Sequence, residues 1–99
     1  MYFISTIRIA GCIVDDCRTI GFNSNYGDLY NDVMNNAVDM FECGYYQYAV
    51  ISYLQEGKFY PTVVQQQWFK YIPLENDNYE IITIDKPQEL EGYSPYIIG

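Results

Sequence analysis

One segment of this chain has helical periodicity, and segments rich in β-branched and aromatic residues lie on both sides of it. The apolar residues of this segment recur at the spacing of an α-helix, at Tyr26, Leu29, Tyr30, Val33, Ala37 and Met40. Ser24 or Asn25 can cap its N-terminus, and Asp28 suits the first turn because the helix dipole favours an anion there. We therefore expect one amphipathic helix over residues 26–40, ended by Gly44.

Five other segments predict β-strands, because β-branched and aromatic side chains fit a pleated surface. In chain order they span residues 2–9, 12–22, 45–54, 65–72 and 79–85. The resulting order, β-β-α-β-β-β, predicts an α+β fold in which a mostly antiparallel sheet carries the amphipathic helix on one face.

The length of 99 residues and the hydrophobic content of 49% indicate a single domain, 1–99, that can bury a core without disulfides or metals. Residues 88–99 read as a C-terminal tail with one helical turn, which follows the break at Lys86-Pro87.

The charge balance restricts the partners that the chain can have. Five Lys and Arg against 13 Asp and Glu give a net charge of −8, so nucleic-acid polymers and anionic membranes would repel the chain. No apolar run approaches the roughly 20 residues that span a bilayer, and the N-terminus lacks the basic start of a secretory leader. Three cysteines, an odd number, suggest reduced thiols and a cytoplasmic protein.

The chain has no histidine. This removes the commonest general base, the commonest metal ligand and every Ser-His or Cys-His nucleophile pair. Cys12, Cys17 and Cys43 lack the close pairing of a zinc site, and no Asp-rich calcium loop is present. We therefore expect a protein that is not an enzyme and that holds no cofactor and no metal.

Twelve tyrosines form the most distinctive part of the composition. In the predicted strand 45–54, Tyr46 and Tyr48 should point to one face, and Tyr45 and Tyr53 to the other. Since one helix covers one face, the second face should present an aromatic surface or a partner. Tyrosine serves ordinary packing there, or it recognises a nucleobase, a protein or a second copy of the chain.

The few basic residues are candidates for binding phosphate. Arginine binds phosphate with two parallel hydrogen bonds, although pairing with nearby carboxylates is the alternative for each cation. Trp68 is more typical of a core or interface anchor than of a ligand platform. The candidate ligand-binding residues are Arg8, Arg18, Tyr46, Tyr48 and Lys70.

The carboxylates permit a different kind of partner. Seven of them gather along the helix and in the last hairpin, at Asp28, Asp32, Asp39, Glu42, Glu75, Asp77 and Glu80. Such a spread can imitate the phosphates of DNA and block a nucleic-acid-binding protein. The alternative is a solvated helix face.

Several strings resemble a group of largely uncharacterised proteins from phages and prophages of Gram-positive gut bacteria. They are Arg18-Thr19-Ile20-Gly21-Phe22, Asn35-Asn36-Ala37 with Asp39 and Glu42, Tyr46-Gln47-Tyr48-Ala49-Val50-Ile51, Glu56-Gly57 with Tyr60-Pro61, Trp68-Phe69-Lys70, Pro87 and Ile98-Gly99. The resemblance implies a counter-defence role in the cytoplasm of an infected bacterium, and it carries over no site residues.

Three functions remain open from the sequence. The leading hypothesis is a counter-defence sponge that sequesters a small phosphorylated, nucleotide-type immune signal by tyrosine stacking and Arg–phosphate contacts. Because a chain this small has little room to enclose a ligand, we expect a homo-oligomer whose second subunit completes the pocket. The alternatives are an acidic inhibitor, of anti-CRISPR or DNA-mimic type, that binds a host defence nuclease, and a phage structural or housekeeping oligomer.

Overall fold

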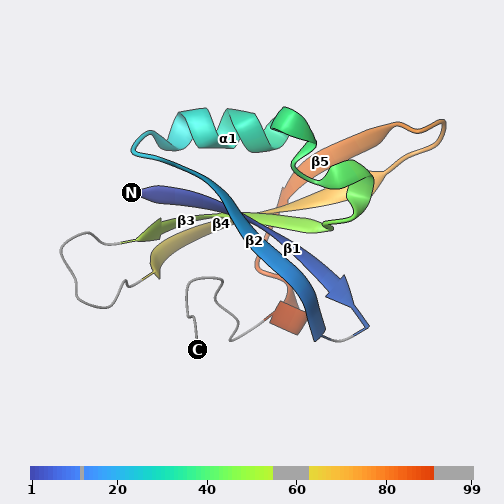
Figure 1. Cartoon of the computed structure of the whole chain (residues 1–99), viewed down its shortest axis with the longest axis horizontal. Coiled ribbons are helices and arrows are strands. Elements are labelled where there is room, and N and C mark those ends of the chain that lie inside the picture. The colour runs from blue at the N-terminus through green and yellow to red at the C-terminus, as the bar shows by residue number, and fades with distance from the viewer. Residues whose placement is uncertain (12, 55–62, 91–99) are drawn as a thin grey trace.

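The computed structural model describes residues 1–11, 13–54 and 63–90 of the chain. Its five strands are β1 (Tyr2–Ala10), β2 (Ile13–Asn23), β3 (Tyr48–Leu54), β4 (Val63–Pro73) and β5 (Tyr79–Ile84). They form one sheet in the order β2-β1-β3-β4-β5, and every neighbouring pair is antiparallel. Helix α1 (Tyr26–Met34) lies across one face of this twisted sheet (Figure 1). The expected α+β fold is confirmed.

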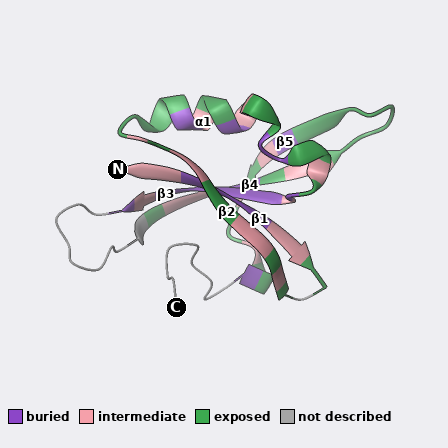
Figure 2. Cartoon of the chain, viewed as in Figure 1, coloured by how far each residue is buried: buried purple, intermediate pink, exposed green. Residues whose placement is uncertain are grey.

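The middle of the sheet is buried on both faces. Strand β3 lies between β1 and β4, and Ala49, Val50, Ile51 and Ser52 along it are all buried (Figure 2). A strand covered on both faces needs a nearly continuous apolar run rather than strict alternation. The sequence of β3 meets that requirement, which explains why the chain places it at the centre.

Two apolar clusters cover the two faces of the sheet. The cluster under α1 contains Ile4, Leu29, Val33, Met40, Phe41, Ala49, Ile51, Phe69 and Ile81. The cluster on the opposite face contains Ile7, Tyr48, Val50, Trp68 and Leu90. Leu90 belongs to η3 (Gln88–Leu90), the helical turn expected in the tail. The second face is therefore partly covered within the chain, rather than being the open aromatic surface that one helix alone would leave.

Helix α1 starts as expected and ends earlier than expected. Asn25 caps it, because its side-chain oxygen accepts the backbone N–H of Asp28 at 3.2 Å. The helix stops at Met34, and Asn36 then adopts the left-handed conformation (φ 48°). Its side chain accepts the N–H of Phe41 at 3.0 Å, a bond that competes with a continuing helix.

Two 3-10 turns follow α1, η1 (Ala37–Asp39) and η2 (Glu42–Gly44). They replace the last part of the helix predicted over residues 26–40. Gly44 still ends this region, with φ of 94°. A Cβ atom at Gly44 would lie 3.0 Å from a ring carbon of Tyr71, so this position needs glycine for both conformation and space.

The strand predicted over residues 45–54 begins at Tyr48. Tyr46 precedes the strand, so the prediction that Tyr46 and Tyr48 point to one face of it is wrong. Tyr48 lies in the cluster opposite α1, whereas the Tyr46 ring lies beside Arg18. The end of the predicted tail, residues 91–99, lies outside the described residues.

Candidate ligand-binding cleft

Most of the described tyrosines gather on the face of the sheet that α1 covers. A row of aromatic rings runs from the sheet to the helix and back into the core, with centre-to-centre distances of 4.8, 5.5, 6.0 and 5.6 Å between successive rings. The members of this row are Tyr53, Tyr2, Tyr26, Tyr30 and Phe69. Phe69 is fully buried, so the row is anchored at that end and reaches the surface near Tyr26 and Tyr53.

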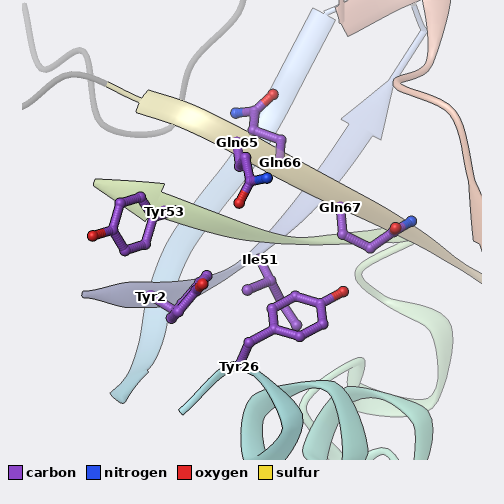
Figure 3. Close-up of a pocket in the computed structure, with 7 residues that line it drawn as sticks. All are labelled: Tyr2, Tyr26, Ile51, Tyr53, Gln65, Gln66 and Gln67. Atoms are coloured by element: carbon purple, nitrogen blue, oxygen red, sulfur yellow. The ribbon is translucent and has the colours of Figure 1, made fainter. Parts of the chain in front are cut away.

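A cleft of about 320 Å³ opens along this row. It is lined by Tyr2, Tyr26, Ile51, Tyr53, Gln65, Gln66 and Gln67, and we call it the tyrosine cleft. Figure 3 shows Tyr26 projecting from the start of α1, with side chains of β1, β3 and β4 across from it. The volume falls at the lower end of the range typical of small-molecule sites, roughly 300–1,000 Å³.

The register of the strands places the residues of the tyrosine cleft side by side. Tyr2 of β1 pairs with Tyr53 of β3, and Tyr53 pairs in turn with Gln65 of β4. Ile51 and Gln67 form the next pair on the same face, since residues two apart in a strand share a face. The wall therefore consists of side chains from three strands, and helix α1 adds Tyr26 opposite them.

Several hydrogen-bonding groups in the tyrosine cleft have no partner among the described residues. Gln67 donates to the carbonyl of Trp68 at 3.0 Å, and Gln66 accepts the Trp68 indole N–H at 3.3 Å. Within the described part of the chain, the Gln65 carboxamide makes no hydrogen bond, and neither do the hydroxyls of Tyr2, Tyr26 and Tyr53. Polar groups in a cleft usually have hydrogen-bond partners. Since these groups have none among the described residues, they are available to a ligand.

The described residues that line the tyrosine cleft are neutral. Burial is the main cause that raises the pKa of the Tyr26 hydroxyl, and the neighbouring phenols of Tyr30 and Tyr2 add to the effect. Tyr26 therefore stays protonated near neutral pH and can donate a hydrogen bond. The described lining of the tyrosine cleft contains aromatic rings, carboxamides and one Ile, without a charged side chain. Such a site can stack a flat molecule and bond to its edge.

Of the candidate residues from the sequence, Arg18 and Tyr46 lie together beyond the end of α1. The Arg18 guanidinium carbon is 4.7 Å from the centre of the Tyr46 ring. One Arg18 nitrogen lies 3.1 Å from the Glu42 carboxylate and donates to the Met40 carbonyl at 3.2 Å. Arg18 therefore pairs with a carboxylate of the chain, which was the alternative to phosphate binding that the sequence left open for each cation.

Arg8 makes similar contacts next to Arg18. Its guanidinium lies 4.3 Å from the centre of the Tyr45 ring, donates to the Tyr45 carbonyl at 2.8 Å and pairs with Asp15 at 3.2 Å. Both arginines thus hold residues 40–46 against the β1–β2 hairpin, while their charges are balanced by carboxylates of the chain.

Tyr46 is buried between these elements. Its hydroxyl donates to Asp16 at 2.8 Å. Burial, and then this hydrogen bond, raise the pKa of Tyr46 to about 12. The hydroxyl is therefore engaged within the protein rather than turned to a ligand.

Tyr48 and Lys70 lie on the opposite face of the sheet. They are cross-strand partners of β3 and β4, with the Lys70 ammonium 5.9 Å from the Tyr48 ring centre. The Tyr48 hydroxyl donates to Glu89 at 3.1 Å. The five candidate residues therefore form two groups on opposite faces, and neither group lines the tyrosine cleft.

The residues of the tyrosine cleft were missed at the sequence level. The run Gln65-Gln66-Gln67 inside a predicted strand was the available signal, because alternation places its first and third carboxamides on one face. The partners of those glutamines come from β1, β3 and α1, and the sequence does not reveal which strands are neighbours.

Two of the four carboxylates predicted along the helix lie outside it, because α1 ends at Met34. Asp28 and Asp32 are exposed on α1, whereas Asp39 and Glu42 lie in the 3-10 turns beyond it. Glu42 is paired with Arg18. The exposed acidic surface of α1 is therefore smaller than the periodicity predicted.

Comparison with protein-family models, with curated proteins and with solved structures found no match to this chain. Among residues 1–11, 13–54 and 63–90, no group of three or more His, Cys, Asp or Glu side chains is arranged to hold a metal ion. In the same residues, no helix has the length and apolar character needed to cross a membrane. The geometry of the tyrosine cleft is thus the basis for a functional proposal.

Proposed function

We propose that this chain is a non-catalytic binding protein that sequesters a small nucleotide-derived molecule, with the base of that molecule in the tyrosine cleft. The observation that carries the proposal is that one cleft contains neighbouring tyrosine rings together with hydrogen-bonding groups that have no partner among the described residues. The resemblance to phage proteins supplies a setting for the proposal, that of a counter-defence sponge for an immune signal.

A nucleobase suits this cleft better than an aliphatic ligand does. A base is flat and stacks on aromatic rings, an interaction that contributes about 1–3 kcal/mol per base. Its edge carries donors and acceptors that a carboxamide can match with two hydrogen bonds, as Gln and Asn do with adenine. The Gln65 carboxamide and the phenol hydroxyls offer both kinds of group.

The phosphates of such a ligand would lie outside the tyrosine cleft. No Arg or Lys is among its described lining residues, and Arg8 and Arg18 are engaged elsewhere with carboxylates. The proposal therefore departs from the expected Arg–phosphate recognition. It implies that a nucleoside should bind nearly as well as its nucleotide.

The first test is a thermal-shift panel of nucleobases, nucleosides, nucleotides, cyclic mono-, di- and trinucleotides and ADP-ribose derivatives. A compound at about 100 times its Kd stabilises the fold by about 2.7 kcal/mol, which raises Tm by roughly 10–20 °C for a domain of this size. The expected result is a shift that is selective for one base and persists in its nucleoside. A flat panel would overturn the proposal.

A thermal-shift panel without any shift would favour the acidic inhibitor, which one observation supports. Asp28 and Asp32 are exposed one turn apart on α1 and can meet a basic groove. Reversing both charges should then abolish capture of a basic target, and it should leave base binding by a sponge unchanged.

Site variants test where the base binds. Tyr26→Leu removes an exposed ring of the tyrosine cleft, and Gln65→Ala removes a carboxamide that has no hydrogen-bond partner among the described residues. Each should weaken binding of the selected nucleoside about tenfold, which corresponds to about 1.4 kcal/mol. Tyr79→Leu is the matched control, because Tyr79 is also exposed but lies outside the cleft. Equal losses in the cleft variants and the control would place the site elsewhere.

A further inference from the structure

A second hollow, of about 350 Å³, lies where the turns after α1 meet the β4–β5 hairpin. Its walls include the rings of Tyr71 and Tyr79 and the carboxylates of Asp39 and Asp77, and we call it the carboxylate pocket. It shares no lining residue with the tyrosine cleft, so its occupant is a separate question.

The aromatic wall of the carboxylate pocket consists of two stacked rings, and a third ring packs against one of them. The Tyr71 and Tyr79 rings are 5.0 Å apart with 17° between their planes, and Tyr71 also contacts Phe41 at 5.7 Å. Tyr79 is 43% exposed. Since one of its faces lies on Tyr71, the other face and the ring edges are open to a ligand.

The charge of the carboxylate pocket is negative. The backbone N–H of Cys43 and the Asn36 carboxamide donate to Asp39, and these bonds lower the pKa of that carboxyl. The bond to Asp39 also raises the pKa of the Cys43 thiol, which therefore stays neutral. Asp77 adds a second carboxylate, and the described lining includes no basic residue.

The carboxylate of Asp39 is held in place before any ligand arrives. Asn36 is almost fully buried, donates to Asp39 at 3.1 Å and accepts the Phe41 N–H at 3.0 Å. Asn36, Asp39, Cys43 and Asp77 all have left-handed backbone conformations, with φ between 48° and 60°. A carboxylate that hydrogen bonds already orient loses less conformational freedom when a ligand binds.

We infer that the carboxylate pocket binds an organic cation, a guanidinium or ammonium group, from a small amine or from an Arg or Lys side chain of a protein partner. A cation over the open face of Tyr79 is attracted by the negative face of the ring, and the carboxylates add a direct charge interaction. An anion would be repelled by the two carboxylates, and a neutral ligand would gain hydrogen bonds from them but no charge interaction. Leu74, half exposed in the same pocket, can cover the apolar stem of a basic side chain.

The test uses two probes of the same shape and different charge. N-acetyl-arginine amide and its neutral isostere N-acetyl-citrulline amide are titrated into ¹⁵N-labelled protein, and the amide signals of residues 36–43 and 71–79 are followed. We expect saturable shifts with the arginine probe, and binding at least fivefold weaker with the citrulline probe. Equal shifts with both probes, or none with the arginine probe at millimolar concentrations, would overturn the inference.

A third probe, butylammonium, distinguishes the two cationic groups. Binding equal to that of the arginine probe indicates that an ammonium group suffices. Binding only of the arginine probe indicates that the pocket requires a guanidinium group. Both results support a cation site.

Matched variants distinguish binding in the carboxylate pocket from attraction of the probe by the net negative charge of the chain. Asp77→Asn removes one charge, and Asn tolerates the left-handed conformation of that position. Tyr79→Leu removes the ring. Each should weaken the arginine probe threefold to tenfold, whereas Asp32→Asn makes the same charge change on α1 and should have no effect. An equal effect of Asp32→Asn would show that net charge alone attracts the probe and would overturn the inference.

Discussion

The guanidinium of Arg18 lies over the ring of Tyr46, 4.7 Å from its centre, although the two residues belong to different parts of the fold. Arg18 is on the edge strand β2, and Tyr46 follows the 3-10 turns. Since Tyr46 also donates to Asp16 on β2, the contact fixes the turns to the sheet edge at two points. This relationship assigns Arg18 a structural role that its sequence position did not reveal.

The first prediction concerns Arg18→Ala. The variant loses one partly exposed ion pair, one cation–ring contact and the hydrogen bond to the Met40 carbonyl, and we expect a total loss of about 1 kcal/mol. For a domain of this size, Tm should fall by roughly 4–8 °C, measured by calorimetry. Nucleoside binding in the tyrosine cleft should be unchanged. A loss of binding without a loss of stability would instead make Arg18 a ligand contact, as the sequence suggested.

The second prediction concerns stability at high pH. Tyr46 has a pKa of about 12 in the folded protein, against 10.0 for an ordinary tyrosine. Because the folded state holds this proton more tightly, the stabilisation is fully present below pH 10 and is lost as pH rises from about 10 to 12. Urea unfolding at a series of pH values should show this decline.

Tyr46→Phe is the control for that measurement. Tyr26, Tyr48 and Tyr71 also have raised pKa values and contribute a decline in the same direction. The variant should therefore flatten part of the decline between pH 10 and 12 and leave the remainder. An identical pH dependence in the variant would show that the Tyr46 proton is not held more tightly in the folded state.

The third prediction concerns the end of α1. Asn36→Gly keeps a residue that tolerates φ of 48° but removes the acceptor for the N–H of Phe41, a buried residue. An unsatisfied buried N–H costs about 1–3 kcal/mol. Asn36→Ala adds the cost of a left-handed residue with a Cβ, about 1–2 kcal/mol. Urea midpoints should rank wild type above Gly and Gly above Ala, and an Ala variant at least as stable as the Gly variant would refute this reason for the helix end.

The strands, the two ends of α1 and the tyrosine cleft show what local sequence patterns predict and what they miss. Strand segments and the start of α1 were predictable because β-branched and aromatic content and a capping residue at Ser24 or Asn25 are local signals. The end of α1 was missed because Ala37 and Met40 continue the helical spacing, while Asn36 bonds to Phe41 instead of continuing the helix. The tyrosine cleft was missed because it depends on which strands become neighbours, a long-range property that pairs Tyr2 with Tyr53.

The fourth prediction separates stacking from hydrogen bonding in the tyrosine cleft. The Tyr53 hydroxyl has no hydrogen-bond partner within the described part of the chain, so Tyr53→Phe should leave the free energy of unfolding unchanged within about 0.5 kcal/mol. If the hydroxyl bonds to a base, the same variant should weaken nucleoside binding by about 1 kcal/mol, or roughly fivefold, in a calorimetric titration. Tyr53→Leu should weaken it further, because the ring that lies 4.8 Å from Tyr2 is lost as well. Loss of stability with unchanged binding in Tyr53→Phe would mean that this hydroxyl serves the fold, and it would remove Tyr53 from the recognition of the base.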